Sequence, residues 1–128
     1  MVITHKPDGY SSVSPYLIVN GAQATVDFLV KVFRGVQLRR YADEDGGLLH
    51  VEVRIDDTVV MLADATSDWP SPGSMVHVYV ADVDDTYRRA LAAGATSVQE
   101  PAQKDDLDRR GGVRDAGGTT WWIATQAG

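Results

Sequence analysis

The feature that most constrains the fold is a repeat of one pattern, an apolar strand followed by an amphipathic helix. Residues 14–20 ("SPYLIVN") are short and apolar, which is typical of a buried strand. Residues 21–35 then place apolar side chains at helical spacing, on Ala22, Val26, Leu29, Val30 and Phe33. The same pattern returns at 75–82 ("MVHVYVAD") and 83–94, and each predicted helix ends at a glycine.

Three strand-like segments separated by turn residues follow each predicted helix. They span 36–43, 48–55 and 58–64 in the first half, and 96–101, 111–115 and 119–125 in the second. Both halves therefore read βαβββ, as modules of about 13–64 and 75–126 joined by a linker at 65–74 that is rich in Pro, Gly and Ser.

One module alone would leave a sheet face and its edges exposed, so two modules are expected to combine. We predict a single α+β domain over residues 1–128. Its two tandem βαβββ modules would form a curved mixed sheet with the helices outside and a ligand cup inside.

Alternation along the predicted strands separates a core face from an inward face. In 48–55 the predicted core set is Leu49, Val51, Val53 and Ile55. The adjacent Trp121 and Trp122 must point to opposite faces, and we place Trp121 under a helix and Trp122 in the cup. The inward set mixes aromatic, methionine and polar side chains, which is typical of a small-molecule site. It consists of Ser14, Tyr16, His50, Glu52, Arg54, Met61, Met75, His77, Tyr79 and Trp122.

Composition excludes several classes of function. The net charge of −6 argues against nucleic acid as a partner, because phosphate binding needs a basic surface. The absence of cysteine excludes disulfides, thiolate metal sites and a Cys nucleophile. No apolar run has the length of a membrane span or a signal peptide, so we expect a cytoplasmic protein without a membrane partner.

Four stretches give the chain a resemblance to a known family. They are "PYLIVNGAQATVDFLVKVF", "GGLLHVEVRIDDTVVMLAD", "HVYVADVDDTYRRALAAGAT" and "GVRDAGGTTWWIAT". With them the sequence resembles the vicinal oxygen chelate superfamily, which includes glyoxalase I, bleomycin-resistance proteins and extradiol dioxygenases. The resemblance covers nearly the whole chain and implies both the doubled fold and a homodimer.

Metal-using members of that family hold the ion with four His, Gln or Glu side chains. Aligned on the helix-ending glycines and on the last strands, those positions hold Ser14, Met61, Met75 and Trp122. None is a ligand of the kind that zinc, nickel or iron takes in such a site, so we predict no metal and no cofactor. Relatives also usually carry "DPxG" where this chain has "DAGG", a turn that lacks the rigidity of proline.

Several residues have two interpretations. His50 and His77, with Glu52 beside His50, are either a metal-binding pair or a general acid or base, or simply hydrogen-bonding groups in a polar cup. Trp122 is either a stacking platform for a planar ligand or a plug for its own cavity. Trp69, in the linker, either closes the mouth of the cup, contacts a second subunit or anchors its loop. The run 103–110 ("QKDDLDRR") is interpreted as a solvated loop, with a lid as the alternative.

The leading hypothesis is a metal-independent protein of the bleomycin-resistance type, which binds a small molecule such as a drug or metabolite, with planar aromatic compounds as candidate ligands. The expected ligand-binding residues are Tyr16, His50, Glu52, Arg54, Met61, Trp69, Met75, His77, Tyr79 and Trp122. The first alternative is a lyase, isomerase or dioxygenase-like enzyme that uses His50 or His77. The second is a non-catalytic module that senses a ligand.

Overall fold

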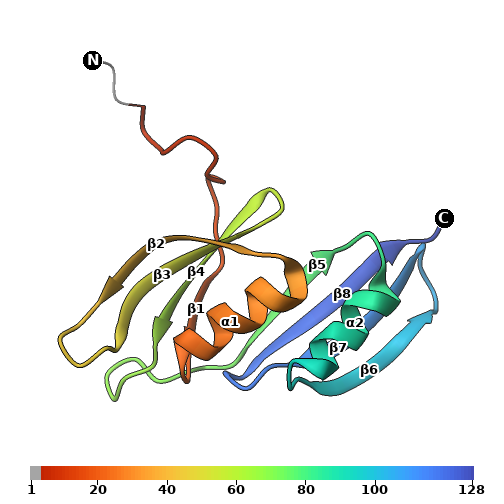
Figure 1. Cartoon of the computed structure of the whole chain (residues 1–128). Helices are drawn as coiled ribbons and strands as arrows, with labels where there is room; N and C mark the ends of the chain where they lie inside the picture. Colours follow the sequence, from red (N-terminus) through yellow and green to blue (C-terminus); the bar gives the residue numbers. More distant parts are fainter. Residues whose placement is uncertain (1–3) are drawn as a thin grey trace.

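The computed structural model describes residues 4–128 and confirms an α+β fold of two tandem βαβββ modules (Figure 1). The first module consists of β1 (Tyr16–Val19), α1 (Ala22–Phe33), β2 (Val36–Ala42), β3 (Leu48–Ile55) and β4 (Thr58–Asp64). The second consists of β5 (Ser74–Tyr79), α2 (Val83–Ala92), β6 (Thr96–Gln103), β7 (Asp108–Arg114) and β8 (Thr119–Gln126).

The eight strands divide into two four-stranded sheets of the same topology, with strand orders β1-β4-β3-β2 and β5-β8-β7-β6. In each sheet the first strand pairs in parallel with the fourth, and the other neighbours are antiparallel. β1 and β5 are both edge strands. The shared topology follows from the repeated order of the elements, because a parallel edge pair requires the helix as its crossover.

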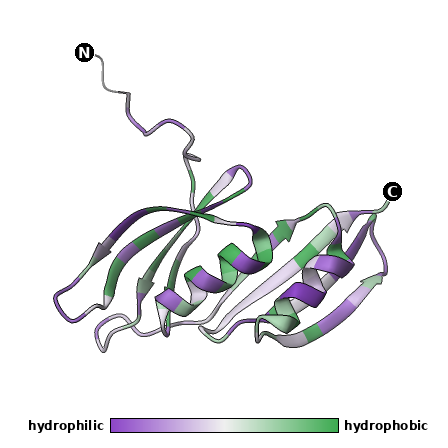
Figure 2. Ribbon diagram, in the orientation of Figure 1, coloured by the Kyte–Doolittle hydropathy of each residue, from purple (hydrophilic) through white to green (hydrophobic). Residues whose placement is uncertain are grey.

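Each sheet buries one face against its own helix. Figure 2 shows hydrophilic and hydrophobic bands alternating along α1, as expected of an amphipathic helix. Its buried face includes Ala22, Val26, Leu29 and Phe33 as predicted, but Val30 is exposed, and the prediction for it was wrong. Thr25 and Phe28 are buried instead, because the face that meets β3 is rotated toward them.

One core joins the two modules. The Phe33 ring at the end of α1 lies 5.3 Å from the Trp121 ring of β8, between centroids. The Arg89 guanidinium of α2 donates a bond of 2.8 Å to the carbonyl of Val32 in α1. Figure 1 shows α1 and α2 beside each other, so both helices cover the same side of the molecule and the opposite sheet faces carry no helix.

A β-bulge corrects the predicted face of one leucine. Tyr41 pairs with His50, but the next residue of β2, Ala42, pairs with Leu48, so Leu49 is an extra residue in β3. The strict alternation therefore fails there. Leu48 is buried in the core, and Leu49 is 61% exposed on the face without a helix.

The run 103–110 is also more ordered than predicted. β6 continues to Gln103 and β7 begins at Asp108, so only a short turn separates them. Two register shifts interrupt the β6–β7 pairing, and such shifts hide the strand period from sequence patterns.

Among the described residues, no helix has the length and apolar character needed to cross a membrane.

Candidate functional site

The predicted inward residues lie on the two sheet faces that α1 and α2 leave uncovered. They fall into two groups rather than one cup. Tyr16, His50, Glu52, Arg54 and Met61 belong to the first sheet, with Ser14 just before it. Met75, His77, Tyr79 and Trp122 belong to the second sheet, and Trp69 lies in the linker.

Four side chains of the first module form a hydrogen-bonded chain. His50 lies 2.8 Å, through Nε2, from Oε2 of Glu52, and its Nδ1 lies 3.1 Å from the Tyr16 hydroxyl. The second oxygen of Glu52 accepts a 2.5 Å bond from the hydroxyl of Tyr10. A carboxylate only accepts, so the Nε2–H of His50 donates to Glu52, and in the tautomer with its proton on Nε2 the Nδ1 atom is an acceptor for the Tyr16 hydroxyl. The strand pairing brings these residues together. His50 and Glu52 lie on the same face of β3, and in β4 Met61 pairs both with Glu52 and with Tyr16 of β1.

Glu52 is 2% exposed, which is unusual for a carboxylate. Burial raises the pKa of its side chain, but the bonds from Tyr10 and His50 favour the charged form more strongly, so that the pKa falls below its ordinary value. The hydrogen bond to Glu52 raises the pKa of the Tyr10 hydroxyl. Glu52 is therefore an anion with a partner on each oxygen.

An apolar hollow of about 510 Å³ adjoins this chain. Tyr16, Ile18, Leu49 and Ala63 form its floor, and Trp69 of the linker borders it. Trp69 is 72% exposed, so its indole is not a buried anchor. The bulge in β3 is what brings Leu49 into this hollow.

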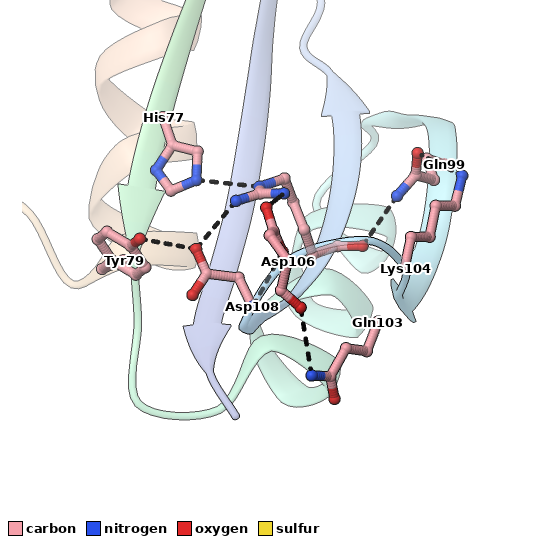
Figure 3. Close-up of polar contacts among 8 residues, drawn as sticks. His77, Tyr79, Gln99, Gln103, Lys104, Asp106 and Asp108 are labelled. Atoms are coloured by element: carbon pink, nitrogen blue, oxygen red, sulfur yellow. Dashed lines mark hydrogen bonds and ion pairs between the residues drawn. The ribbon is translucent and has the colours of Figure 1, made fainter. Parts of the chain in front are cut away.

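A second polar cluster lies on the uncovered face of the second module, where Arg110 bonds to His77, Asp106 and Asp108, the residues labelled with Tyr79 in Figure 3. The Arg110 guanidinium donates from Nε to Nε2 of His77 at 3.1 Å. It also donates to Asp108 at 2.9 Å and to Asp106 at 3.0 Å. Tyr79 completes the cluster with a 2.7 Å hydroxyl bond to Asp108.

These contacts fix the protonation of His77. Desolvation and, next, the positive charge of Arg110 lower the pKa of the ring. A neutral His77 can accept at Nε2, whereas a charged ring would present a proton to a cation. The bond to Asp108 raises the pKa of the Tyr79 hydroxyl, so it stays a donor.

Trp122 lies on the uncovered face beside this cluster, as predicted from the alternation. A Cβ added to the paired Gly112 would lie 2.6 Å from an atom of its ring, so the indole rests directly on the glycine backbone. A hollow of about 380 Å³ beside it is lined by Trp122, Gln99, Lys104 and Arg110, with the acidic residues of the β6–β7 turn. The ring is half-buried, and Trp121 is fully buried under α1.

The residues at the family's metal positions do not suit an ion. Ser14, Met61, Met75 and Trp122 supply no imidazole or carboxylate, and no group of three or more His, Asp or Glu side chains with metal-binding geometry occurs in residues 4–128. No catalytic step is therefore derived through a metal.

Several members of these clusters were not predicted from the sequence. Tyr10 lies in an N-terminal segment without periodicity, and no sequence signal points to it. Arg110, Asp108 and Asp106 lie in the run that was interpreted as a solvated loop. The period-2 pattern of β7 could have indicated Arg110, because it alternates with the core-facing Gly111 and Val113.

Comparison with known proteins places the chain in a family. A model described as the Glyoxalase/Bleomycin resistance protein/Dioxygenase superfamily matches residues 11–123. The uncharacterized protein Rv0887c of Mycobacterium tuberculosis is 39% identical over 123 residues, which cover 86% of this chain and 71% of the relative.

Solved structures agree with this assignment. TioX from Micromonospora sp. ML1 is 28% identical, with a TM-score of 0.76, over 91% of this chain and 98% of that one. TnmS3, an antibiotic binding protein from Streptomyces sp. CB03234, has a TM-score of 0.69 at 19% identity, over 98% of both chains. At that identity the second likeness concerns the fold alone.

Proposed function

The chain belongs to the Glyoxalase/Bleomycin resistance protein/Dioxygenase superfamily, and on this premise we propose that it binds a small molecule with a planar aromatic part, without a metal. The observation that carries the proposal is the uncovered face of Trp122. Its indole rests on Gly112 on one side and borders a hollow with hydrogen-bonding groups at its rim. A flat indole beside polar groups is suited to stacking and orienting a planar ligand.

Exposed apolar side chains on both faces support the same proposal. Met75 is 75% exposed and Tyr79 63%, and Leu49 and Trp69 border the hollow of the first module. A group of exposed apolar side chains on one face of a protein commonly marks a site of interaction. TnmS3 is an antibiotic binding protein on this fold, which is an analogy of fold and leaves the ligand of this chain open.

We propose further that the complete cup forms in a homodimer. The hollows beside Tyr16 and beside Trp122 are separate within one chain. Both sheets also end in an unpaired edge strand, β1 or β5. A second copy would bring an uncovered face of one module against one of the other. The cytoplasmic location expected from the sequence stays a prediction, which cell fractionation tests.

Tryptophan fluorescence tests the binding proposal. We expect planar aromatic compounds, screened as a panel that includes antibiotics, to quench the emission with a saturable curve. Trp122→Ala should then weaken affinity about tenfold or more, because truncating an aromatic anchor removes most of its contact. Trp122→Phe, which keeps a flat ring, is the matched control. If no compound class changes the emission, and Trp122→Ala alters only stability, the proposal is wrong.

One observation favours an enzyme as the second candidate. In the chain from Glu52 through His50 to Tyr16, a buried carboxylate orients an imidazole whose other nitrogen lies 3.1 Å from a hydroxyl. That arrangement suits proton transfer by His50. Mass spectrometry of compounds that bind would reveal conversion, and His50→Gln should abolish it while affinity stays. Recovery of every bound compound unchanged would argue against this candidate.

A further inference from the structure

The N-terminal arm, residues 4–15, leads into β1, and its last residues lie beside the start of β4, on the side where β1 pairs. The amide of Met61 donates to the carbonyl of Pro15 at 2.9 Å, next to the β1–β4 pairing. Further along β4, the amide of Val59 donates to the Ser11 hydroxyl at 3.4 Å. The arm thus contacts β4 through single hydrogen bonds just before β1 begins.

Tyr10 then reaches across the sheet to β3. Its hydroxyl bonds to Glu52, and the guanidinium of Arg39 lies 5.4 Å from the centre of its ring. Glu52 and Val59 are both buried although they lie on the face that no helix covers, whereas Tyr16 on the same face is exposed. The arm is the cover that buries them.

Few contacts hold this cover in place. Residues 4–9 are all exposed and form no helix or strand, and Lys6 bonds only within the arm, to Ser12. The contacts to the sheet are those of Tyr10, Ser11 and Pro15. A segment with so little buried surface opens at a much smaller free-energy cost than the sheet beneath it.

The arm also covers one end of the hydrogen-bonded chain whose other end, Tyr16, lines the hollow of the first module. Both oxygens of Glu52 already have partners, Tyr10 on Oε1 and His50 on Oε2. Glu52 is 2% exposed, so a polar ligand group reaches Oε1 only when Tyr10 moves aside. A buried carboxylate is costly without a partner, so the exchange must be direct.

We propose that the N-terminal arm is a detachable strap over the first module's side of the ligand cup, latched by the Tyr10–Glu52 bond and displaced by an entering ligand. This inference rests on the proposed binding function and adds its regulation. The strap keeps Glu52 paired while the cup is empty, and its release exposes Glu52 and His50.

Amide hydrogen exchange read by NMR tests the strap without any ligand. The variant is Tyr10→Phe, which keeps the ring and removes the hydroxyl. The control is Tyr41→Phe, an exposed tyrosine near His50 on the same sheet with no hydroxyl partner among the described residues. We expect the Val59 amide to exchange about tenfold faster in Tyr10→Phe, because one hydrogen bond to a charged group is lost. The amide of the buried Val53 should be unchanged, which verifies that the sheet remains folded.

The same proteins are then titrated with the planar dye 8-anilinonaphthalene-1-sulfonate. We expect tighter binding to Tyr10→Phe than to wild type or Tyr41→Phe, and faster Val59 exchange in wild type once dye is bound. Unchanged Val59 exchange in Tyr10→Phe would show a fixed arm and overturn the strap. Faster exchange with unchanged dye affinity would overturn its role over the cup. A dye that binds none of the three proteins would contradict the proposed function instead, while Val59 exchange would still decide whether the arm detaches.

Discussion

Trp121 and Trp122 are adjacent in the sequence and meet opposite environments. The Trp121 indole is fully buried against Phe33 and donates from Nε1 to Asp115 at 2.8 Å. The Trp122 ring lies on the other face, against Gly112. The Trp122 ring can lie there because its partner in the neighbouring strand, Gly112, has no side chain. Any Cβ at that position would meet the ring.

Gly112→Ala should therefore displace the Trp122 ring. The new Cβ would lie 2.6 Å from a ring atom, closer than real contacts allow, and overpacking of this kind costs about 1–3 kcal/mol. Urea unfolding gives the loss of stability. In the background of Trp122→Ala the same change should cost much less, since the ring is gone. Equal costs in both backgrounds would contradict the observed packing.

Glu52 makes stability depend on pH. Its pKa in the folded protein lies below the ordinary 4.5, so the folded state binds fewer protons than the unfolded chain near that pH. Its contribution is fully present above 4.5 and is lost as the pH falls through the lowered value. We expect Glu52→Gln to lose less stability than wild type on acidification below about pH 4.5, measured by thermal unfolding across a pH series. Parallel curves for the two proteins would disprove this.

At the scale of elements, a buried carboxylate holds the turn between β7 and β8, which contains no proline. Asp115 is buried and accepts bonds of 3.0 Å from the amides of Gly117 and Thr119, besides the Trp121 indole. The Asp115 carboxylate therefore holds this turn, in which no proline restricts the backbone angle φ. It also orients the strand that carries both tryptophans.

Asp115→Ala should cost about 2–4 kcal/mol, because it leaves two amides and a buried indole N–H without their charged acceptor. Chemical denaturation measures this loss. Asp45→Ala, in the exposed turn between β2 and β3, is a suitable control and should be close to neutral. A comparable effect at both positions would mean that Asp115 does not hold the turn.

At the scale of the molecule, two similar modules share one core but leave two uncovered faces. One chain alone could enclose a ligand only if the two uncovered faces bordered a common hollow. The hollows at Tyr16 and at Trp122 are separate, so enclosure requires a second copy. A symmetric pair is the simplest closed arrangement that covers self-complementary faces.

Light scattering at micromolar concentration should therefore give twice the mass of the chain. Met75→Glu, which puts a charge on an exposed methionine of the uncovered face, should shift the protein toward the monomer. Leu91→Glu makes the same kind of change on α2, on the helix side, and should leave the dimer intact. A monomeric wild type would contradict the homodimer.

The sequence by itself determined the doubled fold. Strands β3 and β4 were predicted to the residue, and Asp82, just before α2, caps that helix with a 3.1 Å bond from the amide of Asp85, as an aspartate in that position commonly does. The opposite faces of Trp121 and Trp122 also followed from alternation. These features depend on side chains a few positions apart, so periodicity and capping patterns record them directly.

Only the tertiary structure decided which side chains meet. Tyr10 and Glu52 are 42 positions apart, and His77 and Arg110 are 33 apart, so no local pattern relates them. The bulge at Leu49 and the division of the inward residues between two sheets depend on strand pairing across the chain. Such contacts form only where packing brings distant segments together. They are stabilised by interactions between residues far apart in the sequence, so a pattern of neighbouring residues cannot predict them.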